Sequence, residues 1–228
     1  MELPTKKLPP KRKSPRVLCL FGPTKMGKTE MLSELNDCLI VDAEEGTAYL
    51  ESMRVEANSL KDLEQVLKLL KDREERYKYI ALDTIDCMVE WFEKYSLLVH
   101  NKNNPSKKAD SIGSIPFGAG FHDVRVRTMS YIKRFKAFTD NLIIIGHVKK
   151  SILPNDLGEE VQTKALDLPG KLKNILMADC DAIGLVTRNS DNELIVSFKG
   201  SGETEAGSRC KHLADSVINF EWDKIYID

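Results

Sequence analysis

The chain has 228 residues, of which 42% are hydrophobic, and a formal net charge of -1. That size and composition predict an ordinary folded domain, and the near-neutral charge excludes a protein whose overall field attracts polyanions. The five cysteines form no Cys-x-x-Cys pair, which excludes a zinc knuckle and a disulfide framework and predicts reduced thiols. No apolar run approaches the ~20 residues of a membrane span, and no apolar core follows the basic N-terminus as in a secretory signal. We therefore expect a cytoplasmic protein with no membrane partner.

Residues 1–16 are rich in lysine, arginine and proline, which predicts a flexible basic tail. The tail could contact nucleic-acid phosphates, but a solvated extension is the preferred interpretation. From Val17 onward, strand-like and helix-like segments alternate without a linker or an internal repeat. Residues 17–228 are therefore predicted to form one domain.

The predicted elements alternate in type along the domain. Strands are expected at 17–22, 38–46, 54–58, 77–83 and 141–147, and helices at 27–35, 60–76, 84–100, 121–138 and 171–179. Continuous apolar strands between helices are typical of a mostly parallel sheet covered on both faces, so the fold class is α/β. A long polar loop is expected at 148–170. Strand-like runs at 181–189 and 193–200 flank turn residues and predict a C-terminal β-hairpin.

The segment Gly22-Pro23-Thr24-Lys25-Met26-Gly27-Lys28-Thr29 fits the phosphate-loop pattern G-x-x-x-x-G-K-[ST] at every fixed position. A strand enters the loop and a helix leaves it, so its N–H groups can surround phosphate oxygens. We expect Lys28 to reach the β- and γ-phosphates of ATP and the Thr29 hydroxyl to bind Mg²⁺. Glu30 completes the expected nucleotide-binding segment. A glycine turn before a core helix is the disfavoured alternative.

Carboxylates follow two later strands and suit a magnesium-dependent reaction. The apolar run at 77–83 ends in Asp83, which matches the Walker-B pattern and predicts a second magnesium ligand. Asp86 is interpreted as an acid that favours a helix N-terminus. The strand at 38–46 ends in Asp42, Glu44 and Glu45, and one of these acids could activate water near the γ-phosphate.

His147 ends the strand at 141–147 and is expected at the same sheet edge, because carboxyl ends of parallel strands line a ligand crevice. A polar side chain there could sense the γ-phosphate and signal to the loop that follows. A histidine that only terminates a strand is an equally good interpretation of the residue type.

This order of motifs resembles the RecA-like P-loop ATPase core. It is most similar to short phage and bacterial RecA-like ATP-binding proteins, including phage single-strand annealing proteins of the Sak group. The resemblance implies that Glu44 activates the attacking water and that Asp83 is the Walker-B residue, although Glu45 stays open as the base. The family's sensor is commonly glutamine, and His147 stands in that position here.

The resemblance also implies partners. The DNA-binding loop of the family follows the sensor strand, which places it here at about 148–168, with Lys149, Lys150 and Lys164. Family members form homo-oligomers with ATP at subunit interfaces, and Arg209 and Lys211 are the candidates for a basic residue that reaches the neighbour's ATP. Either could equally be an exposed surface charge. Single-stranded DNA and a single-strand binding protein are the expected partners, in the host cytoplasm if a phage encodes the chain.

Other segments could also contact DNA. Basic residues gather in the loop near 101–110 and on the predicted helix at 121–138, although a solvated helix face is slightly the better interpretation of the latter. No base-reading motif is present, so sequence-specific binding is not expected.

Three functions follow as hypotheses. The first is an ATP-hydrolysing RecA-like protein that acts on single-stranded DNA in recombination or replication, by annealing or strand pairing. The second is a P-loop kinase of nucleosides or other small molecules, which would need an arginine-rich lid. The third is a nucleotide-gated scaffold with little turnover.

Overall fold

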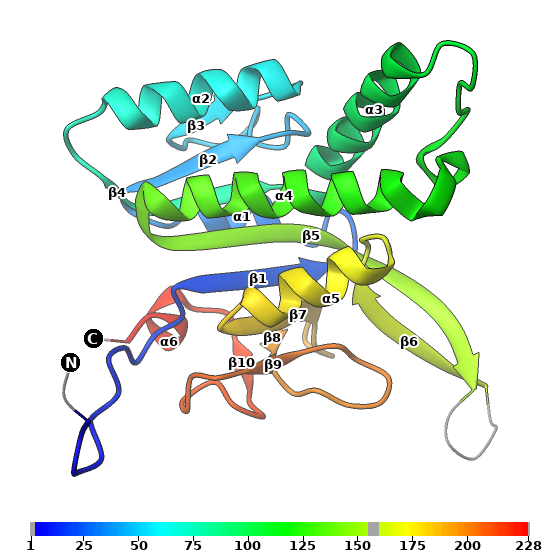
Figure 1. Cartoon of the computed structure of the whole chain (residues 1–228). Helices are drawn as coiled ribbons and strands as arrows, with labels where there is room; N and C mark the ends of the chain where they lie inside the picture. Colours follow the sequence, from blue (N-terminus) through cyan, green and yellow to red (C-terminus); the bar gives the residue numbers. More distant parts are fainter. Residues whose placement is uncertain (1–2, 155–159, 228) are drawn as a thin grey trace.

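The computed structural model describes residues 3–154 and 160–227, which fold around one central sheet with helices on both faces (Figure 1). Apolar runs form the buried strands, as the sequence predicts. The strands are β1 (Val17–Gly22), β2 (Cys38–Asp42), β3 (Arg54–Glu56), β4 (Tyr77–Asp83), β5 (Thr139–Pro154), β6 (Glu160–Leu166), β7 (Ala182–Arg188), β8 (Leu194–Ser197), β9 (Gly207–Ser208) and β10 (Val217–Asn219).

The sheet has the order β10-β8-β7-β1-β5-β4-β2-β3, with β6 paired to β5 and β9 to β7. The strands from β7 to β3 in this order are parallel to their neighbours, whereas β8 and β10 are antiparallel. The predicted α/β class with a mostly parallel sheet is confirmed. The antiparallel pair of β7 and β8 is the predicted C-terminal hairpin.

Helices cover the sheet in two layers. In Figure 1, α2, α3, α4 and α5 lie on one face, while α1 and α6 lie on the other. Short connecting turns η1 (Ile112–Ser114) and η2 (Pro116–Gly118) precede α4. The helices are α1 (Lys28–Ser33), α2 (Leu60–Asp72), α3 (Ile85–Asn103), α4 (Ala119–Ala137), α5 (Gly170–Asp179) and α6 (Trp222–Ile225).

The two layers share the side chains of β1. Val17, Cys19 and Phe21 join the hydrophobic cluster under α2 to α5, and Leu18 and Leu20 join the cluster under α1 and α6. Alternate residues of a strand point to opposite faces, so a strand buried on both faces is apolar throughout. The phosphate loop therefore begins at the end of one of the most buried strands.

The predicted long loop after His147 is wrong, because most of it is a β-hairpin. β5 continues through 148–154 and pairs antiparallel with β6, with Val148 opposite Leu166 and Lys150 opposite Lys164. The sequence gives no strand pattern here, because a ribbon that projects from the sheet needs no apolar face and its residues are largely polar. Residues 155–159 of the predicted loop lie outside the described residues.

The last residues of the predicted N-terminal tail contact the domain. The Ser14 hydroxyl donates to the Ile227 carbonyl at 2.7 Å, and the Arg16 backbone N–H donates to Asp181 at 2.9 Å. These contacts connect residues 12–16 to the amino edge of the sheet, where Arg12 also reaches the Asp140 carbonyl. The flexibility of the preceding residues stays a prediction. Within the described residues, no helix combines the length and the apolar character needed to cross a membrane.

Candidate nucleotide site

The predicted site residues meet at the carboxyl edge of the sheet. Asp42 at the end of β2 is in register with Asp83 at the end of β4, and Gly22 at the end of β1 is in register with His147 in β5. Parallel strands bring their carboxyl ends to one edge, so residues far apart in sequence become neighbours. Asp42, Asp83, Gly22 and His147 thus lie at the sheet edge where the sequence predicts them.

The phosphate loop starts in a tight contact with β7. A Cβ atom on Gly22 would lie 2.5 Å from the Val186 carbonyl oxygen, so only glycine lets β1 approach that closely. Further along the loop, Lys25 and Gly27 have positive φ angles of 60° and 98°. Glycine adopts the second angle without strain, and the loop then turns directly into α1.

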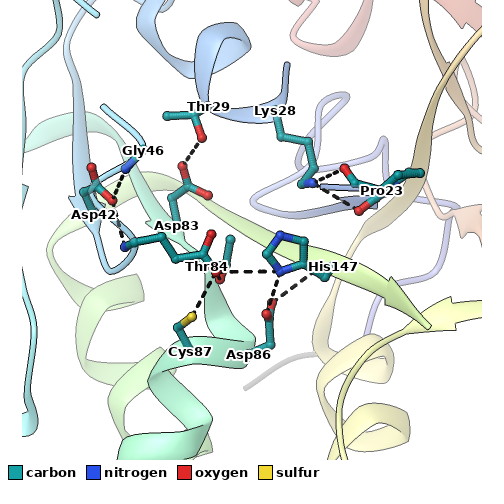
Figure 2. A network of polar contacts seen from close by, with 12 residues as sticks. Pro23, Lys28, Thr29, Asp42, Gly46, Asp83, Thr84, Asp86, Cys87 and His147 are labelled. Atoms are coloured by element: carbon teal, nitrogen blue, oxygen red, sulfur yellow. Dashed lines mark hydrogen bonds and ion pairs between the residues drawn. The ribbon is translucent and has the colours of Figure 1, made fainter. Parts of the chain in front are cut away.

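The Lys28 side chain folds back onto the start of the phosphate loop. Its ammonium donates to the backbone carbonyls of Gly22 at 3.0 Å and Pro23 at 2.7 Å, as Figure 2 shows. Burial lowers the pKa of Lys28, while the carboxylates of Asp83, Asp86 and Glu44 oppose that change. A buried cation beside backbone N–H groups is suited to bind the phosphates of a nucleotide.

Thr29 and Asp83, the two predicted magnesium ligands, lie side by side. The Thr29 hydroxyl donates to Asp83 Oδ2 at 2.7 Å, and both side chains face the same pocket. Burial raises the pKa of Asp83 to about 6, against the opposing effect of the Thr29 hydrogen bond. A hydroxyl and a desolvated carboxylate are hard oxygen donors of the kind that Mg²⁺ takes alongside nucleotide phosphates. The donor set therefore fits the metal.

Asp42 organises the turn that carries Glu44. Its oxygens accept hydrogen bonds from the backbone N–H groups of Glu44 (3.0 Å), Gly46 (3.2 Å) and Thr47 (2.8 Å), and from the Thr47 hydroxyl. Burial alone would raise the pKa of Asp42, but these hydrogen bonds outweigh it and hold the pKa below its usual range. Asp42 therefore uses both carboxylate oxygens to stabilise the turn at residues 44–47.

Glu44 faces the first turn of α3. Its Oε1 accepts hydrogen bonds from the Thr84 hydroxyl at 2.8 Å and from the Cys87 thiol at 2.9 Å. Burial raises the pKa of Cys87 to about 12, and the Glu44 carboxylate adds to the rise, so the thiol stays protonated and can donate. Glu45, the other candidate base, has no place in the lining of this pocket.

His147 contacts a carboxylate that the sequence analysis assigned only to the helix. Its Nδ1 lies 2.7 Å from Asp86 Oδ2 and 3.7 Å from Glu44 Oε1. Asp86 does lie in the first turn of α3, as interpreted, but it also connects that helix to β5. Figure 2 shows Asp86, His147, Thr84 and Cys87 as one polar network beside Lys28 and Asp83.

These side chains surround a pocket of about 340 Å³. Tyr49 lines this pocket and is 98% exposed. An exposed aromatic ring can stack on a nucleobase. The lining residues are Thr24, Lys25, Met26, Gly27, Lys28, Thr29, Glu30, Glu44, Gly46, Tyr49, Leu50, Asp83, Thr84 and His147.

Arg209 and Lys211 lie away from this pocket. The Arg209 backbone N–H bonds to the Asp181 carbonyl, just before β7 begins, and its guanidinium donates to the Ala178 carbonyl at 2.6 Å. That position is the amino edge of the sheet, opposite the phosphate loop. Within one chain they do not reach the nucleotide, so their predicted role requires a neighbouring subunit and stays a prediction.

Sequence reasoning missed Thr84 and Tyr49, which line the pocket, and the contacts of Asp86, Cys87 and Arg188, which lie beside it. Asp86, Thr84 and Cys87 follow the Walker-B strand directly, so the same edge rule would have gathered them. Arg188 ends β7 beside β1, and its Nη2 would lie 3.8 Å from a Cβ atom on Gly27. Tyr49 gives no signal in the sequence, because its exposure depends on the turn that Asp42 holds.

The comparison with known proteins agrees with this geometry. A family described as an AAA domain has a model that matches residues 14–210, which include the phosphate loop, Asp83 and His147. No curated protein matches the chain. The matched range covers well over half of the sequence. The chain therefore belongs to this AAA-domain family of P-loop, nucleotide-binding ATPases.

Proposed function

We propose that the protein is a RecA-like ATPase of the short phage type, which hydrolyses ATP and acts on single-stranded DNA in recombination or replication, by annealing or strand pairing in the cytoplasm. One observation carries the proposal. A single pocket holds the buried Lys28 ammonium, the Thr29–Asp83 pair and the Glu44 carboxylate. A kinase needs the first two groups, whereas a hydrolase also needs the third.

Each group has a separate task in hydrolysis. Lys28 binds the phosphate oxygens, together with the backbone N–H groups of the loop and the start of α1. Thr29 and Asp83 would hold Mg²⁺, and the ion would supply positive charge against the charge that develops on the phosphates. Glu44 accepts the proton of the attacking water, and Thr84 and Cys87 fix the carboxylate by its other oxygen. The hydrogen-bonded Asp42 turn keeps Glu44 at the pocket.

The hairpin of β5 and β6 is the proposed DNA contact. It starts at His147, and its base is tightly packed because a Cβ on Gly146 would lie 2.3 Å from Leu166 Cδ1. Lys149 and Lys150 are exposed on β5, and Lys150 lies opposite Lys164. Cations on a projecting ribbon can bind phosphates without reading bases. A stiff ribbon joined to the nucleotide sensor could transmit ATP binding to DNA.

The basic face of α4 supports DNA binding less well. Arg127 is paired with Asp123 at 2.7 Å, Lys136 with Asp179 at 3.1 Å, and Arg134 with Glu64 at 2.6 Å. Each pair neutralises a cation that would otherwise attract phosphates. On the hairpin, Lys149 is paired with Asp167 at 3.6 Å, whereas Lys150 and Lys164 have no ion pair within the described residues. We therefore place the DNA at Lys150 and Lys164 of the hairpin.

We further propose a homo-oligomer in which the amino edge of one subunit meets the carboxyl edge of the next. That contact would bring Arg209 or Lys211 to the neighbour's ATP, where a cation stabilises phosphoryl transfer. The Arg209 side chain is 64% exposed, and its guanidinium holds the Ala178 carbonyl at 2.6 Å and Asp181 at 3.7 Å, so it would exchange these partners for the neighbour's phosphates. A single-strand binding protein would supply the coated DNA.

The test is the ATPase rate of wild type and Lys28→Ala, with and without single-stranded DNA. We expect turnover that DNA stimulates and that Lys28→Ala abolishes. Turnover without stimulation would contradict the DNA part alone. ATP binding and assembly without turnover would favour the scaffold, and transfer of phosphate to a nucleoside in a substrate panel would favour the kinase.

A further inference from the structure

One carboxylate holds His147 at two points. Asp86 Oδ1 accepts a hydrogen bond from the His147 backbone N–H at 3.1 Å, and Oδ2 lies 2.7 Å from the ring Nδ1. Asp86 belongs to the first turn of α3, three residues after Asp83, so it joins the end of β4 to β5. Because both contacts use the same carboxylate, the place of the ring and its rotation are fixed together.

The same contact selects the ring nitrogen that carries the proton. An ionised carboxylate can only accept, so Nδ1 must be the donor across the 2.7 Å contact. A neutral imidazole has a single N–H, and Nε2 is then a bare acceptor. Figure 2 shows the second ring nitrogen pointing away from Asp86, toward the space between Lys28 and Asp83. No hydrogen bond joins Nε2 to any part of the chain that the structure describes.

We propose that Asp86 is a positioning residue, which holds His147 in its Nδ1–H form so that Nε2 accepts a hydrogen bond from the water that attacks the γ-phosphate. This inference rests on the proposed ATP hydrolysis and adds a residue to it. In that step the water oxygen bonds to the γ-phosphorus, the bond to the β-phosphate oxygen breaks, and the water proton goes to Glu44. Nε2 takes no proton and only orients the water.

The positions of the neighbouring groups fit a base at Glu44 and a water-orienting ring at His147. Glu44 Oε1 lies 3.7 Å from His147 Nδ1, so the proposed base and the orienting ring stand side by side. Nδ1 forms its hydrogen bond with Asp86 at 2.7 Å and not with Glu44 at 3.7 Å, which leaves the Glu44 carboxylate free for the water proton. A histidine that must present one bare nitrogen needs a partner that fixes its tautomer, and Asp86 is in place to do so.

A second metal ion is the competing use of the cluster. Ligand atoms of Glu44, Asp86 and His147 lie within 4.8 Å of one another. However, two ligands at the ~2.1 Å bond length of a tetrahedral site would lie about 3.4 Å apart. The observed 2.7 Å contact is a hydrogen bond instead.

The test uses Asp86→Asn, which keeps the size of the side chain but offers an amide N–H to Nδ1 and so moves the ring proton to Nε2. We expect kcat for ATP to fall roughly 10- to 100-fold, while KM changes by less than roughly threefold, because water orientation and not ATP binding is lost. Nitrogen-15 NMR of the histidine rings, with the His147 signal assigned by its loss in His147→Gln, should show Nδ1–H in wild type and Nε2–H in the variant.

A double-mutant cycle separates positioning from a structural role. With His147→Gln there is no tautomer to select, so adding Asp86→Asn should change kcat by less than roughly twofold. An equal loss in both backgrounds, an Nε2–H ring in wild type, or saturable Zn²⁺ binding that Asp86→Asn abolishes would each overturn the inference. The NMR result needs no turnover. A wild type that binds ATP without hydrolysing it would refute the proposed function, and the tautomer would still decide the role of Asp86.

Discussion

The Thr29 hydroxyl and the Asp83 carboxylate are 54 residues apart in sequence and 2.7 Å apart in the fold. Asp83 is desolvated at the end of β4, and burial raises its pKa to about 6. Thr29 is placed against it by the turn from the phosphate loop into α1. A buried carboxylate at this position is costly unless a cation binds there, and that cost leads to a stability prediction.

Asp83→Asn should stabilise the nucleotide-free protein at pH 7. The pKa of Asp83 rises from 3.8 to about 6 on folding, so between these values the folded state binds more protons and this group makes stability fall as pH rises. Removing the charge should raise the free energy of unfolding by about 1–3 kcal/mol at pH 7, and the gain should vanish near pH 4. Urea unfolding at both pH values checks this.

The companion experiment repeats the urea unfolding of wild type and Asp83→Asn with Mg²⁺ and ATP present. The free energy of unfolding of wild type should rise when Mg²⁺ and ATP are present, because ligands that bind only the folded state stabilise it. Asp83→Asn should gain much less. Equal gains in both proteins would show that Asp83 does not hold the metal.

Glu44→Gln should abolish turnover without abolishing ATP binding. The amide cannot accept the water proton, so we expect kcat to fall by roughly 100-fold or more while ATP affinity changes little. Glu45→Gln is the matched control, since Glu45 is exposed and does not line the pocket. Single-turnover hydrolysis and equilibrium ATP binding measure the two effects. Loss of turnover in the Glu45 variant alone would assign the base to the other acid.

Asp42→Asn should loosen the turn that carries Glu44. Asp42 uses both oxygens to accept hydrogen bonds, and asparagine would turn an N–H group toward the Thr47 donors. The free energy of unfolding should fall by about 1–3 kcal/mol, and kcat should fall with it. Asp72→Asn on the exposed end of α2 should change stability by only about 0.5 kcal/mol or less. A fully stable Asp42 variant would contradict the role given to this turn.

Lys150→Glu together with Lys164→Glu should weaken single-stranded DNA binding and its stimulation of the ATPase, with the DNA-free rate unchanged. Reversing two cations on the hairpin should also lower the salt dependence of binding, since fewer counterions are released. Lys68→Glu on α2 is an exposed control. Fluorescence anisotropy at several salt concentrations gives the result. Unchanged DNA binding in the hairpin variant would place the DNA elsewhere.

The sequence predicted the nucleotide edge better than the contacts within it. Apolar runs that end in Gly22, Asp83 and His147, combined with the edge rule for parallel sheets, were enough to gather these positions. The Asp86–His147 contact could not be predicted, because it depends on how the first turn of α3 faces β5. Sequence does not show that β5 lies between β1 and β4.

Two segments could not be placed from the sequence, for similar physical reasons. The hairpin after His147 lacks the apolar alternation that reveals a half-buried strand, so its polar ribbon reads as a loop. The position of Arg209 depends on β9, a strand of two residues at Gly207–Ser208 that is too short to leave a pattern. Both segments are fixed by pairing with distant strands and not by local preference.

Equilibrium binding of ATP by calorimetry, with and without Mg²⁺, tests the central claim most directly. Wild type should bind ATP more tightly with Mg²⁺ present, and Lys28→Ala should lose roughly 10-fold or more in affinity, since a buried charge-assisted contact is removed. Lys199→Ala, an exposed lysine on the chain after β8, should bind as wild type does. Equal ATP affinity in wild type and Lys28→Ala, or no ATP binding by wild type, would contradict the assignment of this pocket.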